Sequence, residues 1–249
     1  DQLSLALDDG RLIDVDPRSR TLADLRFDFW IQAFSGFLAA LICFLVLLLS
    51  SDKSERSGRM AFVITGVGFA LSSLFAAIYS TRDLFIQGDL FFAASLMNHL
   101  GSSLFATGLI AFLWNYPAIL FGSRLAWCVF SLPLISTLSA QFFPVHPETA
   151  VMFYLPYGIS LIAALIGLFV QWMKSAPGSE ERIKVRWIFI SVVAGTGIFA
   201  ITAIVPMLMG RPPLASQSMV LVTFVFMYFG MLFAVIRHRV FDLDPWYLK

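Results

Sequence analysis

The chain has 249 residues, of which 59% are hydrophobic and only 13% are charged. This composition, with a positive mean hydropathy, excludes an ordinary soluble globular domain and predicts an integral membrane protein. The formal net charge of +1 offers no basic field for a nucleic-acid backbone. No stripe of Lys and Arg with interleaved aromatic residues is present either, so nucleic acid is not an expected partner.

Residues 1–28 precede the first long apolar run and carry a hairpin pattern. Leu3, Leu5 and Leu7 alternate with polar residues, a turn signal follows at 8–10, and an apolar pattern resumes at Leu12. This alternation predicts two short β-strands. Because a lone hairpin is marginal in water and the chain begins with Asp rather than Met, we interpret 1–28 as the end of a longer extracytoplasmic domain. A disordered leader is the alternative.

Runs of about 20 apolar residues, the length that crosses a bilayer, predict seven transmembrane spans. In chain order they are 29–50, 60–80, 90–116, 124–143, 149–172, 187–209 and 217–236. Charged, turn-rich or proline-containing stretches separate them. The predicted fold is therefore an all-α membrane protein, a seven-transmembrane helix bundle over 29–236, with a short β-rich stub before it and a linker over 237–249 after it.

The distribution of Lys and Arg predicts the orientation. The loops at 51–59, 117–124 and 173–186 and the C-terminal tail carry most of these residues, whereas the opposite short loops carry only Arg82 and Arg211. By the positive-inside rule the N-terminus is outside and the C-terminus is cytoplasmic. The arginines within 1–28 conflict with this rule unless they belong to a folded, translocated domain.

Every Asp, Glu, Lys and Arg can be placed outside the spans or at their ends. This disfavours a proton pump or an ion-coupled transporter, which need ionisable groups near the midplane. No zinc-binding pair, phosphate loop or nucleophile elbow occurs, and His99, His146 and His238 are predicted at different depths. Cys43 and Cys128 lie in apolar runs without metal or disulfide spacing. We therefore expect no catalytic residue, no metal and no cofactor.

The third predicted span contains the most polar stretch inside any span. Asn98 and Ser102 lie four residues apart, as do His99 and Ser103, so each pair shares a helix face. Such residues commonly form hydrogen bonds between packed helices. The alternative is that Asn98 and His99 line a pocket about 12–14 Å below the outer surface, at 1.5 Å per residue.

Polar and aromatic residues of other spans are predicted to reach the same outer half. As a set they could bind a lipid-like or small amphipathic signal, with its polar head near Arg82 and its body among Phe and Leu side chains. Each tyrosine alone is equally typical of an interfacial anchor. The candidate ligand-binding residues are Tyr79, Arg82, Asn98, His99, Ser103, Tyr154, Tyr157 and Gln217.

The last span ends in "FGMLFAVIRHRVFDLD", where basic residues mark the inner boundary and an acidic pair follows. This element resembles the exit from the multi-span N-terminal sensor region of bacterial two-component sensor histidine kinases. The stretches "AAIYSTRDLF" (76–85), "MNHLGSSLFATGLIAFLWNYP" (97–117) and "KVRW" (184–187) are similar to the subgroup with a seven-span sensor. The resemblance covers most of 29–244. It implies signal transmission through Arg237, Arg239, Phe241, Asp242 and Asp244.

The resemblance also implies a receptor in the inner (cytoplasmic) membrane of a Gram-negative bacterium, homodimeric in full length, with a downstream response regulator as partner. A PDZ-like extracytoplasmic domain can precede the first span in this subgroup. The chain departs from the family because it contains no phosphoacceptor His box and no ATP-binding box, so kinase activity would belong to a cytoplasmic core outside it. Two alternatives remain: a channel or carrier for a neutral or apolar solute, and a structural membrane subunit.

Overall fold

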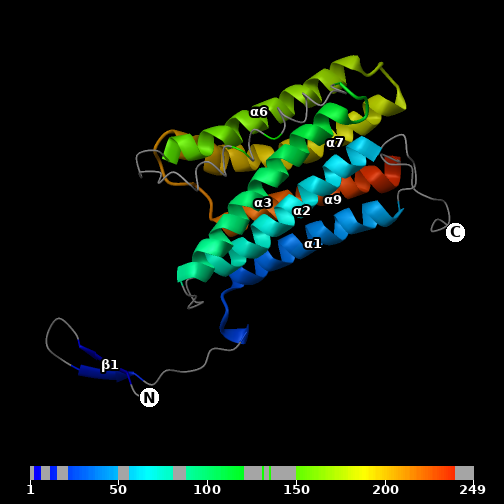
Figure 1. Ribbon diagram of the computed structural model, residues 1–249. Coiled ribbons are helices and arrows are strands. Elements are labelled where there is room, and N and C mark those ends of the chain that lie inside the picture. The colour runs from blue at the N-terminus through cyan, green and yellow to red at the C-terminus, as the bar shows by residue number, and fades with distance from the viewer. Residues whose placement is uncertain are drawn as a thin grey trace.

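The structure is a computed structural model that describes residues 3–6, 12–15, 22–49, 56–80, 88–120, 131, 135 and 150–238. Long helices dominate it (Figure 1). The elements are β1 (Leu3–Ala6), β2 (Leu12–Val15), the 3-10 turn η1 (Leu22–Asp24), α1 (Phe27–Leu49), α2 (Arg56–Ser80), α3 (Gly88–Asn115), α6 (Ala150–Lys174), α7 (Glu180–Phe199), the π-helical turn η3 (Ala200–Ile204), α8 (Val205–Leu208) and α9 (Gln217–His238).

Six of the described helical segments are long and apolar enough to cross a membrane. They are Phe27–Leu48, Ser57–Ile78, Gly88–Asn115, Leu155–Lys174, Glu180–Leu208 and Gln217–Ala234. Each coincides with a predicted span, whereas the predicted fourth span, 124–143, lies outside the described residues apart from Ser131 and Ile135. The chain is therefore a helical, multi-pass membrane protein.

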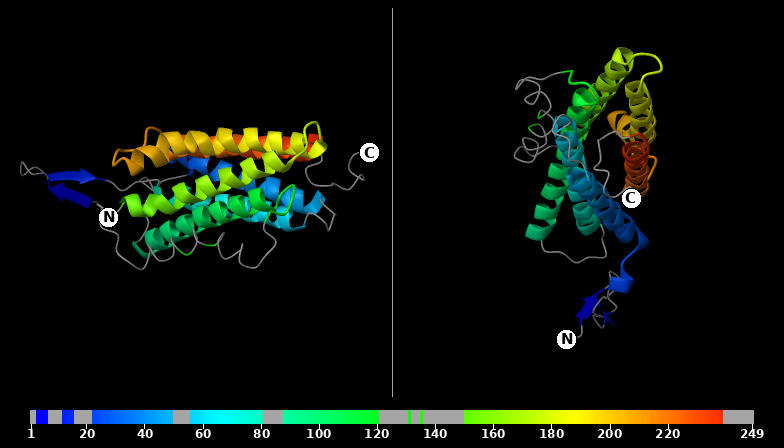
Figure 2. Two further views of the ribbon diagram at one scale, coloured as in Figure 1. Left: turned by 90° about the horizontal axis from the view of Figure 1, so that it is seen from above. Right: turned by 90° about the vertical axis from the view of Figure 1, so that its right-hand side faces the viewer.

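The two short strands lie where the sequence alternates. β1 and β2 pair antiparallel, with Leu3 opposite Val15 and Ala6 opposite Leu12. Figure 2 shows this hairpin beyond the end of the helix bundle, joined to it by the segment before α1. The interpretation of residues 1–28 as the remnant of a folded extracytoplasmic domain stays a prediction.

The sixth predicted span begins earlier than apolar content indicates. Helix α7 starts at Glu180 rather than at 187, and its first turns carry five acidic or basic residues before Trp187. Ser179 caps this start, because its Oγ accepts a hydrogen bond from the Arg182 amide at 3.2 Å. Glu180 and Glu181 then complement the positive end of the helix dipole. Hydropathy misses these turns because they lie at the polar end of the helix.

The helices form a ring in which each element packs on two neighbours. Helix α2 lies between α1 and α3, α6 packs on α3 and less extensively on α7, and α9 packs on α7 and α1. The buried core joins apolar side chains of α1, α2, α3, α6, α7 and α9, including Phe62, Phe112 and Tyr228. Large apolar side chains such as Phe34 and Phe44 remain exposed on the outside, as expected where lipid replaces water.

Glycines allow the closest approaches between helices. A Cβ on Gly101 of α3 would lie 2.7 Å from the Gly68 carbonyl oxygen of α2, and one on Gly108 would lie 2.7 Å from Thr65 Oγ1. These distances are too short for a side chain, so only glycine permits the observed α2–α3 packing. Small residues are typical of such seams between membrane helices.

Helices α3 and α6 run parallel. Ser103 Oγ of α3 lies 3.4 Å from Tyr157 OH of α6, and Trp114 Nε1 further along α3 donates to the Ala163 carbonyl at 2.9 Å. Residue numbers therefore increase in the same direction on both helices. Consequently α3 ends at the end of the bundle opposite to the one at which α6 begins, and Leu120 and Ala150 lie at opposite ends.

We name the two ends by residues they contain. The Arg211 end is where α1, α3, α6 and α9 begin, and the Lys184 end is where these helices finish and α7 begins. The described cations gather mainly at the Lys184 end, which holds Arg59, Lys174, Arg182, Lys184 and Arg186, whereas the Arg211 end holds Arg26 and Arg211.

Candidate ligand-binding cavity at the Arg211 end

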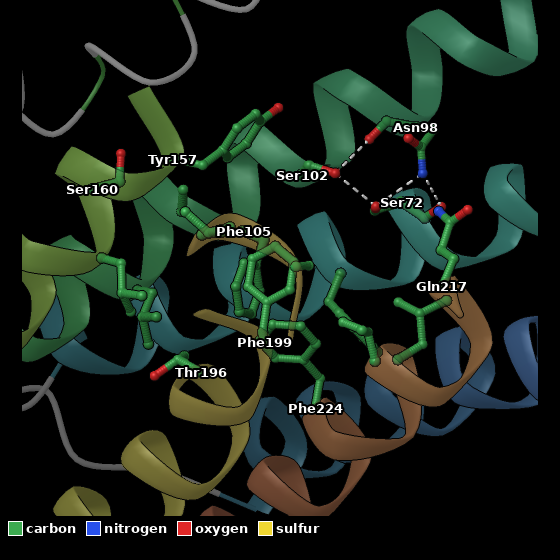
Figure 3. Close-up of a pocket in the computed structure, with 18 of the residues that line it drawn as sticks. Ser72, Asn98, Ser102, Phe105, Tyr157, Ser160, Thr196, Phe199, Gln217 and Phe224 are labelled. Atoms are coloured by element: carbon green, nitrogen blue, oxygen red, sulfur yellow. Dashed lines mark hydrogen bonds between the residues drawn. The ribbon is translucent and has the colours of Figure 1, made fainter. Parts of the chain in front are cut away.

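A cavity of about 330 Å³ lies in the half of the bundle nearest the Arg211 end, between α2, α3, α6, the α7–α8 segment and α9 (Figure 3). Its volume falls within the range of about 300–1,000 Å³ typical of small-molecule sites. The polar residues that line it are Ser72, Asn98, His99, Ser102, Tyr157, Ser160, Thr196 and Gln217, and the aromatic rings are those of Phe69, Phe105, Phe199 and Phe224.

The cavity brings together four of the residues proposed from the sequence. Asn98, His99, Tyr157 and Gln217 all line it, and Ser103 lies beside it, fully buried against Tyr157. Tyr79 and Tyr154 belong to α2 and α6 near the same end, but their side chains lie outside the described part of the molecule, and so does the whole of Arg82. The binding role of these residues stays a prediction.

Asn98 also has the packing role that sequence reasoning left open. Its Nδ2 donates to the Ser72 carbonyl oxygen at 2.6 Å and lies 3.0 Å from Ser72 Oγ (Figure 3). Ser72 Oγ is in turn 2.8 Å from Ser102 Oγ, which donates to the Asn98 carbonyl. The shared face of Asn98 and Ser102 therefore fastens α3 to α2, and the Asn98 amide protons are already used in that contact.

The aromatic wall of the cavity was not identified from the sequence. Phe105, Phe199 and Phe224 come from α3, α7 and α9, and their rings meet at centroid distances of 5.1 Å (Phe105 to Phe224) and 5.4 Å (Phe199 to Phe224). The chain has 26 Phe, and nothing in the apolar pattern separates those that face a cavity from those that face lipid.

A break in the α7 helix shapes one side of the cavity. Pro206 has no N–H and therefore cannot hydrogen-bond to the carbonyl of Thr202, four residues earlier. The turn preceding Pro206 is π-helical, and the Thr202 carbonyl accepts a hydrogen bond from the Leu214 amide at 2.7 Å instead. A π-helical turn is common at functional sites, and this one places Ala203 and Ile204 on the cavity wall.

The same break brings the loop 209–216 against the cavity. In addition to the Leu214 contact, the Arg211 amide donates to the Pro206 carbonyl at 2.8 Å. Pro213 and Ala215 of this loop line the cavity. The sequence predicts this stretch only as a break between spans.

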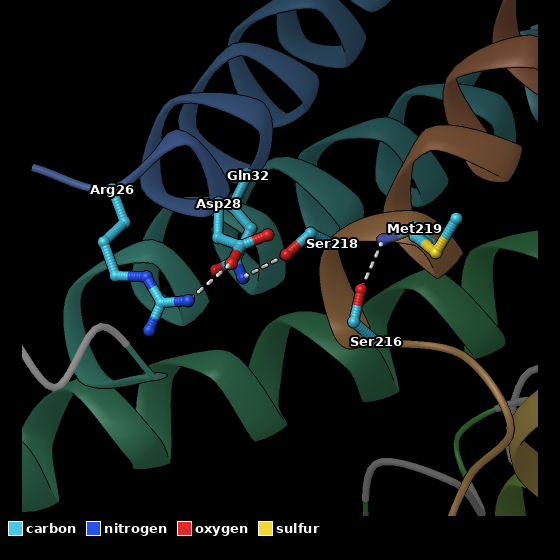
Figure 4. A network of polar contacts seen from close by, with 6 residues as sticks. All are labelled: Arg26, Asp28, Gln32, Ser216, Ser218 and Met219. Atoms are coloured by element: carbon cyan, nitrogen blue, oxygen red, sulfur yellow. Dashed lines mark hydrogen bonds and ion pairs between the residues drawn. The ribbon is translucent and has the colours of Figure 1, made fainter.

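The start of α9, which follows the loop 209–216, is fixed to α1 (Figure 4). Gln32 Nε2 donates to Ser218 Oγ at 3.4 Å, and Ser216 Oγ accepts from the Met219 amide at 3.4 Å, which caps the helix. The nearby ion pair of Arg26 and Asp28, at 4.0 Å, is largely exposed, so it contributes little to stability.

Aromatic side chains connect the cavity with the Lys184 end. We call this set the aromatic column: Phe105, Phe199, Phe224, Phe69, Tyr228, Phe62, Phe112 and Tyr116. Successive rings in the column lie between 5.1 and 6.2 Å apart. Tyr228 of α9 is its fully buried midpoint, and within the described residues its hydroxyl has no hydrogen-bond partner.

Within the described ranges, no three His, Cys, Asp or Glu side chains gather to hold a metal ion. Comparison with known proteins finds no similar protein family, no similar curated protein and no similar solved structure. Fold and cavity together define a multi-pass membrane protein with a candidate small-molecule site.

Proposed function

We propose that this chain is the membrane receptor module of a bacterial two-component sensor histidine kinase, and that the cavity receives its signal. The observation that carries the proposal is the position of α9. Its first turns line the cavity through Gln217, Val220 and Phe224, and its other end leads to residues 237–249. One helix thus contacts both the candidate binding site and the segment that resembles the kinase exit element.

The proposed topology has seven spans, with the Arg211 end outside and the Lys184 end in the cytoplasm. The excess of described cations at the Lys184 end supports this orientation. The parallel course of α3 and α6 supports the seventh span, because the chain has to return along the bundle between Leu120 and Ala150. The apolar run at 124–143 is long enough to do so at 1.5 Å per helical residue.

Cysteine labelling tests this topology. In a background without Cys43 and Cys128, single cysteines replace Pro212 at the exposed Arg211 end, Ala176 at the exposed Lys184 end, and His146 after the proposed fourth span. A membrane-impermeant maleimide applied to spheroplasts is expected to label Pro212→Cys and His146→Cys but not Ala176→Cys, and to label all three after solubilisation. Labelling of Ala176→Cys in intact spheroplasts would show that the orientation is the reverse of the proposed one. Protection of His146→Cys would show that no seventh span crosses the membrane between Leu120 and Ala150.

The remaining parts of the proposal rest on the resemblance. The hairpin of β1 and β2 would be the end of an extracytoplasmic domain, which would be PDZ-like as in the subgroup that the chain resembles. The full-length protein would be a homodimer in the bacterial inner membrane that signals to a response regulator. Arg237 lies in the last turn of α9, while Arg239, Phe241, Asp242 and Asp244 lie outside the described residues.

In the proposed mechanism, an occupant of the cavity changes how Phe199 and Phe224 pack. Phe224 contacts Phe69 at 5.5 Å, and Phe69 contacts Tyr228 at 5.5 Å. Because packed side chains switch between discrete arrangements rather than deforming continuously, a displaced Phe224 would move α9 relative to α2. The movement would reach residues 237–249 through the rigid helix.

The mechanism is tested by filling the cavity without any ligand. Ala203 lines the cavity, so Ala203→Phe mimics a permanent occupant, whereas Ile201, 67% exposed on the same π-helical turn, gives the matched control Ile201→Phe. Spin labels at the exposed positions Met60 of α2 and Phe233 of α9 report the distance between these helices. We expect Ala203→Phe to shift this distance by about 1–2 Å, the size of helix movements in switching proteins, and Ile201→Phe to leave it unchanged.

The channel or carrier alternative finds less support. The cavity occupies only the Arg211 half, and the described residues beyond it toward the Lys184 end are packed core, including the fully buried Phe62, Phe112 and Leu113. A continuous path for a solute would have to cross this core.

A further inference from the structure

The charge of the described cavity lining points to the class of ligand. None of these side chains is Asp, Glu, Lys or Arg, although the cavity has several polar residues. An ionised group moved from water into such surroundings loses its hydration and gains no counter-ion. The described wall therefore offers no countercharge to a carboxylate, a sulfate or an ammonium group.

Three hydroxyl groups of the cavity wall use their protons on backbone carbonyls of their own helices. Ser160 Oγ donates to the Pro156 carbonyl at 2.6 Å, Thr196 Oγ1 donates to the Val192 carbonyl at 2.7 Å, and Ser102 Oγ donates to the Asn98 carbonyl at 3.0 Å. Each hydroxyl has a single proton, so its oxygen retains only acceptor capacity toward a ligand. These three hydroxyls therefore offer an anion no donor.

The three phenylalanine rings lie deeper in the cavity than the side chains of Gln217, His99 and Tyr157. Gln217 opens α9, and His99 and Tyr157 lie on the early turns of α3 and α6, so these polar groups are near the Arg211 end. Phe105, Phe199 and Phe224 lie one to two turns deeper, toward the middle of the bundle. A bound molecule would place its polar group beside Gln217 and Tyr157 and its apolar body among the three rings.

We propose that the ligand is an uncharged amphiphile, with one hydroxyl or carbonyl group on an apolar body of about ten carbons. This inference rests on the proposed function. The size follows from the volume of about 330 Å³, since a group the size of water takes about 30 Å³ in the liquid. The polar group lies toward the Arg211 end and the apolar body lies in the aromatic wall. The described lining has no charged side chain to compensate an ionic amphiphile of the same length.

Three probes with the same ten-carbon chain test this selectivity. Radiolabelled 1-decanol is bound to protein in lipid nanodiscs, with empty nanodiscs subtracted, and decyl sulfate and decyltrimethylammonium compete for it at matched concentrations in the membrane. We expect saturable binding of 1-decanol and at least tenfold weaker competition by both ions. Equal competition by either ion would overturn the proposal. If decyl sulfate competes with 1-decanol and this competition is lost in Arg82→Gln, the proposal is likewise overturned, because Arg82 would then bind an anionic ligand.

Cavity-filling variants locate the binding. Ala203→Phe is expected to reduce 1-decanol binding at least tenfold, and Ile201→Phe is expected to leave it unchanged. Ala106→Leu, on the α3 side of the cavity, is a second filling variant for the case in which Ala203→Phe does not fold. Undiminished binding in both filling variants would place 1-decanol elsewhere and overturn the proposal.

The binding result is independent of helix movement, so the two proposals fail separately. If ionic probes bind equally well while Ala203→Phe still shifts α9, the ligand class is wrong and the receptor function stands. If 1-decanol binds selectively while Ala203→Phe leaves α9 in place, the ligand class stands and the receptor function is wrong.

Discussion

Replacing Gly101 with alanine is expected to destabilise the bundle strongly, although Ala is normally the better helix former by about 0.5–1 kcal/mol. The new Cβ would meet the Ser72 backbone nitrogen, and it would lie 2.7 Å from the Gly68 carbonyl oxygen and 2.9 Å from Leu71 Cβ. Backbone atoms cannot rotate away, so α3 has to separate from α2. Overpacking of this kind costs about 1–3 kcal/mol and occasionally more.

The matched control lies on the same helix. A Cβ on Gly88, at the start of α3, would have nothing within 4 Å, so Gly88→Ala is expected to leave stability unchanged or to raise it slightly. Thermal unfolding of the purified protein in detergent compares the two variants. If Gly101→Ala unfolds at the same temperature as Gly88→Ala, the α2–α3 seam is not packed as described.

Phe224→Ala is expected to have the second large effect, because Phe224 joins the cavity to the rest of the aromatic column. Its ring contacts Phe105, Phe199 and Phe69 and is 5% exposed. In water-soluble cores Phe→Ala costs about 3–5 kcal/mol. We expect a smaller loss here, on the order of 2–3 kcal/mol, because lipid is as apolar as the protein interior and only packing is lost.

The variant should also uncouple the cavity from α9. In Phe224→Ala, the additional change Ala203→Phe is expected to leave the distance between labels at Met60 and Phe233 unchanged, since the new ring can occupy the space left by Phe224. Phe226, 67% exposed on the same helix, supplies the control Phe226→Ala, in which stability and the response to Ala203→Phe should be retained. Loss of the response in both variants would argue against the aromatic column as the route.

Sequence patterns predicted the spans well because the length and apolarity of a membrane helix are local properties. They predicted Asn98, His99, Tyr157 and Gln217 as cavity residues because polar groups are conspicuous in apolar surroundings. Phe199 and Phe224 carry no such signal. Likewise, no local pattern shows that the turn before Pro206 is π-helical, with the distant Leu214 amide bonded to the Thr202 carbonyl, because this contact depends on the tertiary fold.

The packing role of Asn98 illustrates the same limit. Its spacing from Ser102 correctly predicts a shared face, but only the structure places Ser72 of α2 opposite that face. The polar stretch of the third span is thus both a helix–helix contact and part of a cavity wall. The spacing alone could not assign these two roles because they depend on which neighbouring helix each side chain meets.

The central claim is that occupation of the cavity moves α9. The most direct test measures the distance between spin labels at Met60 and Phe233 in nanodiscs, with and without saturating 1-decanol, beside Ala203→Phe without ligand. The account predicts that 1-decanol and Ala203→Phe shift the distance in the same direction, by about 1–2 Å. An unchanged distance in Ala203→Phe, with the variant folded, would contradict it.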